Sequence, residues 1–64
     1  MPLTNFSRGD RVRIKETGQT GTVVEIRRHG PRGRSGYSIV EIMVRVDGVA
    51  APRPFQELEL ERVT

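Results

Sequence analysis

Residues 11–27 read RVRIKETGQTGTVVEIR, and this stretch decides the fold class. At its start, Val12 and Ile14 alternate with basic side chains, and such alternation with a period of two is typical of a half-buried β-strand. The two glycines within residues 17–21 predict a turn, because glycine readily adopts a positive φ. Residues 22–27 are rich in β-branched side chains and predict the returning strand.

The second of these strands contains one irregularity. Its apolar residues Val23, Val24 and Ile26 cannot all face the same side of a regular strand, because side chains alternate between the two faces. A β-bulge, which inserts one extra residue into a strand, removes the conflict. We therefore expect a bulge near Gly21 or Val23.

The period-two pattern returns in the middle of the chain. Within residues 37–46, the apolar residues Val40, Ile42, Val44 and Val46 occupy alternate positions, which predicts the longest strand. Between the second and third strands, the segment from Arg28 to Gly36 holds three glycines, one proline and no apolar residue. That composition predicts a loop.

The C-terminal third predicts two further strands and one tight turn. Asp47-Gly48 is the dipeptide of a two-residue type I′ hairpin, so residues 49–53 should return as a short strand. Two prolines in this region place that strand at an edge, because proline has no N–H to donate. Residues 55–58 predict a single 3-10 turn, and Leu58 and Leu60 predict a last strand ending near Val63.

Five short strands with a 3-10 turn before the last one predict an all-β fold, a five-stranded SH3-like barrel. Closing the sheet removes exposed edges that a small chain cannot otherwise cover. We expect residues 1–7 to form an N-terminal arm and residues 8–64 to form the barrel domain. The predicted core consists of Val12, Ile14, Val24, Ile26, Val40, Ile42, Val44, Leu58 and Leu60, with Phe55 closing one end.

The composition favours binding over catalysis. A chain of 64 residues forms one domain at most and buries only about 60% of its unfolded surface, so we expect no deep pocket. Cysteine is absent, and His29 is the single histidine, for which the sequence indicates no acid–base partner or nucleophile. We therefore expect no catalytic residues, no cofactor, no metal site and no small-molecule substrate. The acidic series Glu57, Glu59 and Glu61 is better explained as a solvated sheet edge than as a cation site.

The positive charge lies mainly in the N-terminal part. The formal net charge is +3, and residues 1–36 carry eight basic and three acidic side chains, whereas residues 37–64 carry three basic and five acidic ones. A basic surface of this kind attracts phosphate or an acidic protein. The residues that we expect to bind such a partner are Arg11, Arg13 and Lys15 on one strand face and Arg27, Arg28, Arg32 and Arg34 in or beside the loop.

Two partner classes remain open. A nucleic acid or a ribonucleoprotein is marginally favoured, because guanidinium groups are fork-shaped donors that suit phosphate. An acidic protein is the alternative, because nucleic-acid-binding barrels usually add stacking aromatic side chains and this chain has few. In either case we expect a non-catalytic binding module, and the oligomeric state stays open.

The sequence also bears on location. The first ten residues lack the apolar core of a signal peptide, and the longest apolar-rich stretch, residues 38–46, contains Glu41 and Arg45. We therefore expect no membrane span and a cytoplasmic protein.

Residues 9–26 resemble the KOW motif of ribosomal and transcription-elongation proteins. The core of that motif is G-x-x-G-x-V-x-x-I, and the matching residues here are Gly18, Gly21, Val23 and Ile26. The resemblance implies a small barrel and fits a ribonucleoprotein partner.

The chain also resembles the small barrels of electron-transport accessory proteins, namely the small barrel protein of photosystem I and the variable chain of ferredoxin-thioredoxin reductase, and the C-terminal domain of the nitrile hydratase β-subunit. The shared features are a Gly-Asp-x-Val-like first strand and an ending like Glu57-Leu58-Glu59-Leu60. Phe6, residues 9–13, Gly36-Tyr37 and residues 60–63 are similar to type II dihydrofolate reductase. That enzyme uses a Val-Gln-Ile-Tyr segment where this chain has Val49-Ala50-Ala51-Pro52, so the resemblance does not imply its activity.

Overall fold

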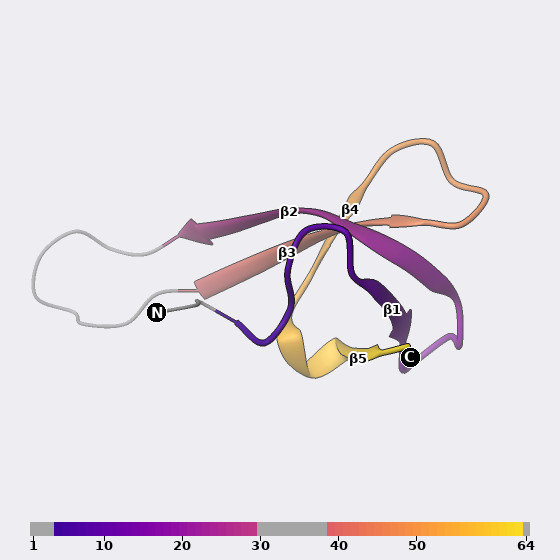
Figure 1. Ribbon diagram of the computed structural model, residues 1–64, viewed down its shortest axis with the longest axis horizontal. Helices are drawn as coiled ribbons and strands as arrows, with labels where there is room; N and C mark the ends of the chain where they lie inside the picture. Colours follow the sequence, from indigo (N-terminus) through magenta and orange to yellow (C-terminus); the bar gives the residue numbers. More distant parts are fainter. Residues whose placement is uncertain (1–3, 30–38, 64) are drawn as a thin grey trace, which may run out of the picture.

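The computed structural model of the chain describes residues 4–29 and 39–63. Its strands form one antiparallel sheet in the order β4-β3-β2-β1-β5 (Figure 1). The prediction of an all-β fold with five strands and a 3-10 turn before the last one is confirmed. The elements are β1 (Arg11–Ile14), β2 (Thr20–His29), β3 (Ile39–Val46), β4 (Arg53–Phe55), the 3-10 helix η1 (Glu57–Glu59) and β5 (Leu60–Arg62).

The predicted bulge lies in β2. Val23 pairs with Val44, but the next pair joins Glu25 to Met43, so Val24 is the extra residue. The bulge turns Val23 into the core, where it is 1% exposed, and leaves Val24 half-buried. The position of the bulge is thus confirmed, whereas the choice of Val24 as the core residue is wrong.

The core also differs from the prediction at two other places. Leu58 is 82% exposed because it lies in η1 rather than in the last strand, which begins only at Leu60. Phe6, which the predicted core omitted, is 7% exposed and packs with the strand residues. The buried apolar residues are Phe6, Val12, Ile14, Val23, Ile42, Val44, Val46 and Leu60, and Ile26, Val40 and Phe55 pack partly buried against them.

The residues before β1 are held against η1 and β5. Thr4 donates a hydrogen bond of 2.6 Å to Glu57, and Asn5 donates one of 3.1 Å to the same carboxylate. Arg62 donates to the backbone carbonyl of Asn5, and its guanidinium carbon lies 5.7 Å from the centre of the Phe6 ring. This segment therefore contributes both apolar packing and polar contacts to the folded domain.

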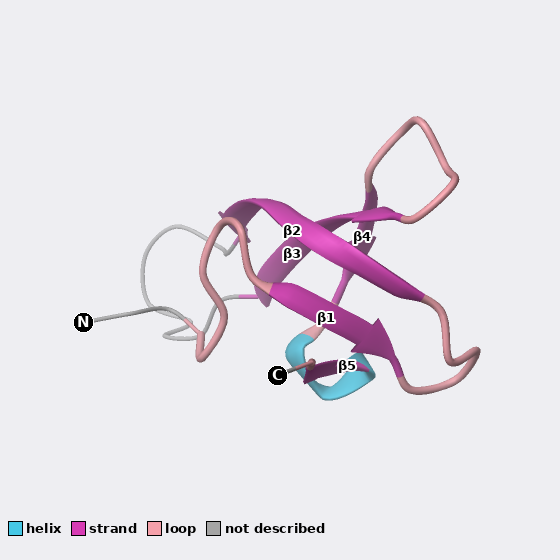
Figure 2. Cartoon of the chain, turned by 45° about the vertical axis from the view of Figure 1, so that its right-hand side comes forward, coloured by secondary structure: helices cyan, strands magenta, loops and turns pink. Residues whose placement is uncertain are grey.

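The connection between β3 and β4 is longer than predicted (Figure 2). Val49 N–H donates to the carbonyl of Val46, so these residues form a tight turn. Gly48 has a φ of +85°, but Asp47 does not have a positive φ, and a type I′ turn requires both. The predicted hairpin is therefore wrong, and the chain pairs again only at Arg53.

The sheet ends at β4 and β5, and no strand pairing joins these two within the described residues. Instead, η1 connects them and contacts both β3 and β5. Pro54 lies in β4 and lacks an N–H, which makes this edge a poor template for a further strand. Across residues 4–29 and 39–63, no helix has the length and apolar character needed to cross a membrane.

Candidate partner-binding surface

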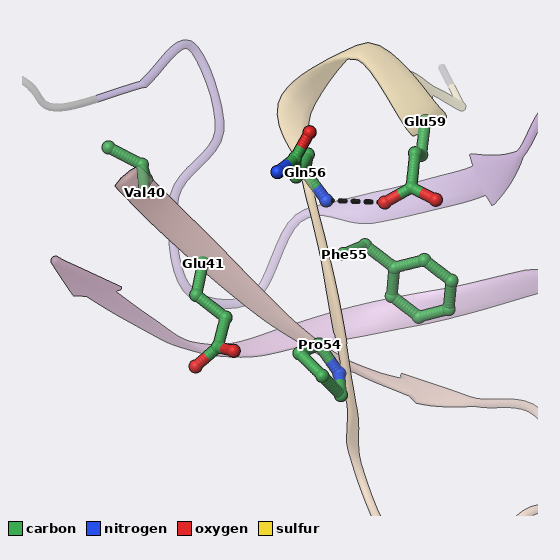
Figure 3. Close-up of a pocket in the computed structure, with 6 residues that line it drawn as sticks. All are labelled: Val40, Glu41, Pro54, Phe55, Gln56 and Glu59. Atoms are coloured by element: carbon green, nitrogen blue, oxygen red, sulfur yellow. Dashed lines mark hydrogen bonds between the residues drawn. The ribbon is translucent and has the colours of Figure 1, made fainter. Parts of the chain in front are cut away.

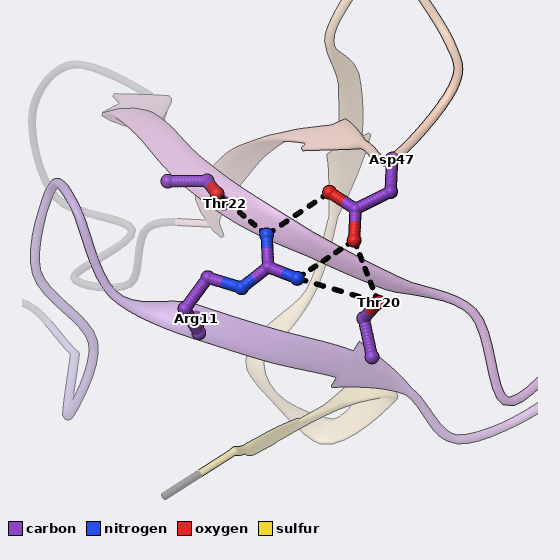
Figure 4. Close-up of polar contacts among 4 residues, drawn as sticks. All are labelled: Arg11, Thr20, Thr22 and Asp47. Atoms are coloured by element: carbon purple, nitrogen blue, oxygen red, sulfur yellow. Dashed lines mark hydrogen bonds and ion pairs between the residues drawn. The ribbon is translucent and has the colours of Figure 1, made fainter.

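Arg11, the first of the predicted binding residues, is engaged inside the chain (Figure 4). Its two terminal nitrogens donate to the two oxygens of Asp47 at 3.0 and 2.7 Å, and one of them also donates to the Thr22 hydroxyl at 2.9 Å. The Thr20 hydroxyl donates to the same carboxylate at 2.8 Å. The bonds from Arg11 and Thr20 favour the charged carboxylate and lower the pKa of Asp47 to about 2.

Two other predicted arginines also have acidic partners. Arg13 pairs with Glu61 at 2.7 Å, directly across from it on β5, and Arg27 pairs with Glu25 at 3.2 Å on the same strand. The bond to Glu25 raises the pKa of Arg27 above its ordinary value. All of these pairs are exposed, and such pairs are worth only about 0–1 kcal/mol each, so a phosphate group can compete for the arginine.

The remaining predicted binding residues fall into two groups. Lys15 and Arg28 are exposed and form no ion pair within the described residues. Arg32 and Arg34 lie outside the described residues. Sequence reasoning did not single out Arg8, Arg45 and Arg53, which are likewise exposed and form no ion pair in the described part of the chain. A pattern of alternation identifies the exposed face but not the carboxylate that each arginine meets.

The described residues carry almost no charge excess. They contain nine basic and eight acidic side chains, and Arg32 and Arg34 account for the other two positive charges of the chain. The strand face around Arg11 and Arg13 is therefore charge-compensated. Most of the net charge of +3 belongs to the segment that joins β2 to β3.

The β2–β3 pair extends beyond its neighbours towards this segment (Figure 1). Its ladder runs from Gly21 opposite Val46 to His29 opposite Ile39, whereas β1 pairs only with residues 20–22 and β4 only with residues 42–44. Within the described residues, the end at residues 26–29 is thus a two-stranded ladder. We call residues 26–29 and 39–41 the ladder end. It presents Arg27 and the unpaired Arg28.

The three acids that the sequence aligned do not share one face. Glu57 accepts from Thr4 and Asn5, Glu59 accepts from the backbone N–H of Gln56 at 2.7 Å, and Glu61 pairs with Arg13. Glu57 and Glu59 belong to η1 and Glu61 to β5. In the described ranges, no three acidic, histidine or cysteine side chains form a group that could hold a metal ion.

Two shallow hollows mark the surface. One of about 210 Å³ lies between β3, β4 and η1 beside Phe55 (Figure 3). The other, of about 660 Å³, lies over β2, β3 and the turn after β3, between Val24, Arg45 and Val49. Both are open to solvent, which suits a surface that meets another macromolecule better than an enclosed substrate site.

No protein-family model, curated protein or solved structure matches the chain. The resemblances to KOW domains and to the small barrels of accessory proteins therefore stay predictions from sequence pattern.

Proposed function

We propose that the chain is a non-enzymatic cytoplasmic binding module with an SH3-like barrel architecture, and that it docks an acidic macromolecule at the ladder end. A nucleic acid or a ribonucleoprotein is the favoured partner. The strand order β4-β3-β2-β1-β5, with η1 between β4 and β5, supports the barrel, because one short helix bridges the two edge strands.

The observation that carries the proposal is the division of the cations. Arg11 and Arg13 are matched by Asp47 and Glu61, so the face of β1 has little charge to offer. Arg28 at the ladder end has no such match, and the sequence adds Arg32 and Arg34 directly after it. A partner with regularly spaced negative charge gains most at this end.

The experiment is a titration of labelled single- and double-stranded oligonucleotides from low to physiological salt. Each phosphate contact on duplex DNA contributes a log–log slope of about −0.9. Replacing Arg27, Arg28, Arg32 and Arg34 together by Ala should therefore flatten the slope by up to roughly 3–4 units. No binding by the wild type at low salt would contradict the proposal.

A matched control separates a local site from general attraction. Replacing Arg8, Lys15, Arg45 and Arg53 by Ala removes the same four charges elsewhere, at residues that form no ion pair in the described part of the chain. We expect this variant to bind more weakly than the wild type but clearly more tightly than the ladder-end variant. Equal losses in the two variants would show that binding depends on net charge alone.

An acidic protein is the second candidate. Two observations favour it, namely the near-neutral described surface and the exposure of Leu58, which is 82% accessible on η1. A pull-down with and without nuclease distinguishes the two classes. Partners that survive nuclease favour protein docking, and partners that are lost favour nucleic acid.

A further inference from the structure

We propose that the hollow between β3, β4 and η1 is a second binding site, which takes an arginine side chain of a partner polypeptide. This hollow is separate from the ladder-end arginines and has the opposite charge. Its lining residues come from three elements: Val40 and Glu41 of β3, Pro54 and Phe55 of β4, and Gln56 and Glu59 at η1 (Figure 3).

The walls of the hollow are held in place by the fold. Phe55 pairs with Ile42 of β3 and packs partly buried against the core, so its ring has a fixed support. The carboxylate of Glu59 is anchored because Oε1 accepts the backbone N–H of Gln56 at 2.7 Å. Its other oxygen, Oε2, accepts no hydrogen bond from the residues that the structure describes. A site that is already ordered before binding loses less entropy when it binds.

The size of the hollow favours one side chain over a small molecule. Its volume is about 210 Å³, below the roughly 300–1,000 Å³ of pockets that enclose drug-sized ligands. It is also open to solvent at one side (Figure 3), so an exposed side chain of a partner can enter without displacing any strand. The occupant is therefore best sought on the surface of another polypeptide.

The chemistry of the walls selects a guanidinium group. Glu41 and Glu59 bring two carboxylates, and none of the six described lining residues is basic. Phe55 and Pro54 supply an apolar platform, on which a planar cation can stack while its fork of N–H donors meets carboxylate oxygens. Lysine has a compact ammonium group without that plane, so we expect arginine to bind more tightly.

The test compares two capped tripeptides by amide NMR of the ¹⁵N-labelled wild-type chain. One is acetyl-Gly-Arg-Gly-amide, and the other carries citrulline, which has nearly the same shape but no charge. We expect the arginine peptide to shift the backbone amides of Glu41, Phe55, Gln56 and Glu59, and the citrulline peptide to leave them almost unchanged. Equal shifts with both peptides, or shifts confined to other surfaces, would overturn the proposal.

Charge-neutral variants then locate the binding. Glu59→Gln keeps an acceptor for the Gln56 N–H and removes the charge, and it should weaken the arginine peptide by about two- to fivefold, the range of one exposed ion pair. Phe55→Leu should weaken it by a similar factor, because the leucine cannot form a cation–π contact. Glu16→Gln, in the turn after β1, is the matched control and should have no effect.

The outcomes separate this site from the ladder end. If Glu16→Gln weakens binding as much as Glu59→Gln, the peptide follows the overall charge and the hollow is not a site. If Glu59→Gln does not fold, the comparison of arginine with citrulline on the wild-type chain still decides the question. Loss of oligonucleotide binding in the ladder-end variant has no bearing on the peptide, so the two proposals fail independently.

Discussion

The burial of Phe6 leads to a strong prediction about stability. Its side chain is 7% exposed and lies under Arg62, with the guanidinium carbon 5.7 Å from the ring centre. Replacing a buried phenylalanine by alanine costs about 3–5 kcal/mol. A single core in a domain of this size supplies rarely more than about 3–5 kcal/mol in total. Phe6→Ala should therefore leave the chain largely unfolded at 25 °C.

Urea denaturation followed by circular dichroism measures the effect. Phe6→Leu keeps most of the apolar volume and should cost less than about 1.5 kcal/mol. With a urea dependence of about 1 kcal/mol per M, that loss moves the midpoint by about 1.5 M or less. Leu58→Ala is the control, because an 82% exposed side chain should change stability by no more than about 0.5 kcal/mol. A stable Phe6→Ala together with an unfolded Leu58→Ala would refute the reasoning.

Three further predictions follow from single contacts. A Cβ at Gly21 would lie 2.6 Å from the carbonyl oxygen of Arg45 and 2.7 Å from a Val44 methyl, so Gly21→Ala should lower the unfolding free energy by about 1–3 kcal/mol; an unchanged urea midpoint would contradict this. Val44 is 0% exposed, so Val44→Asp buries a charge and should remove the wild-type dispersion of chemical shifts; a dispersed spectrum would show that this face points outward. Asp47 has its pKa lowered from 3.8 to about 2, so it stabilises the fold above about pH 4 and this contribution is lost as the pH falls towards 2. Asp47→Asn should therefore show a weaker loss of stability over that pH range, and an unchanged acid sensitivity would contradict the role of Arg11.

The strand pattern was readable in the sequence because it is a local property. Alternation over β1 and β3 predicted which residues face the core, and the conflict among Val23, Val24 and Ile26 predicted a bulge. The sequence could not say which valine the bulge would turn inward, because that depends on the register of β2 against β3. Pairing of Val23 with Val44 settles it.

The errors arose where contacts distant in sequence decide the outcome. Leu58 and Leu60 alternate like strand residues, but η1 occupies the first of them and turns it to solvent. Phe6 stands in a segment without periodicity, and its burial depends on η1 and β5, which lie more than fifty residues away. Neither outcome is encoded in a short window.

The candidate binding surface was predictable in part for the same reason. A basic face on β1 is visible in the alternation, but its neutralisation is not, because Arg13 and Glu61 are separated by 48 residues and Arg11 and Asp47 by 36. Two of the predicted residues, Arg32 and Arg34, lie outside the described residues. The structure thus shifts the emphasis from the face of β1 to Arg28 and the ladder end.

The measurement that tests this most directly is amide NMR of the ¹⁵N-labelled chain titrated with a short duplex oligonucleotide at low salt, where a basic surface attracts phosphate most strongly. We predict that the largest shifts fall on residues 26–29 and 39–41 of the ladder end, while β1, whose Arg11 and Arg13 are already paired, moves little. If no amide shifts at low salt, the nucleic-acid proposal is wrong and protein docking takes its place. If the largest shifts fall on β1, the ion pairs of that strand do not withhold its arginines from a partner, and the assignment of the ladder end is contradicted.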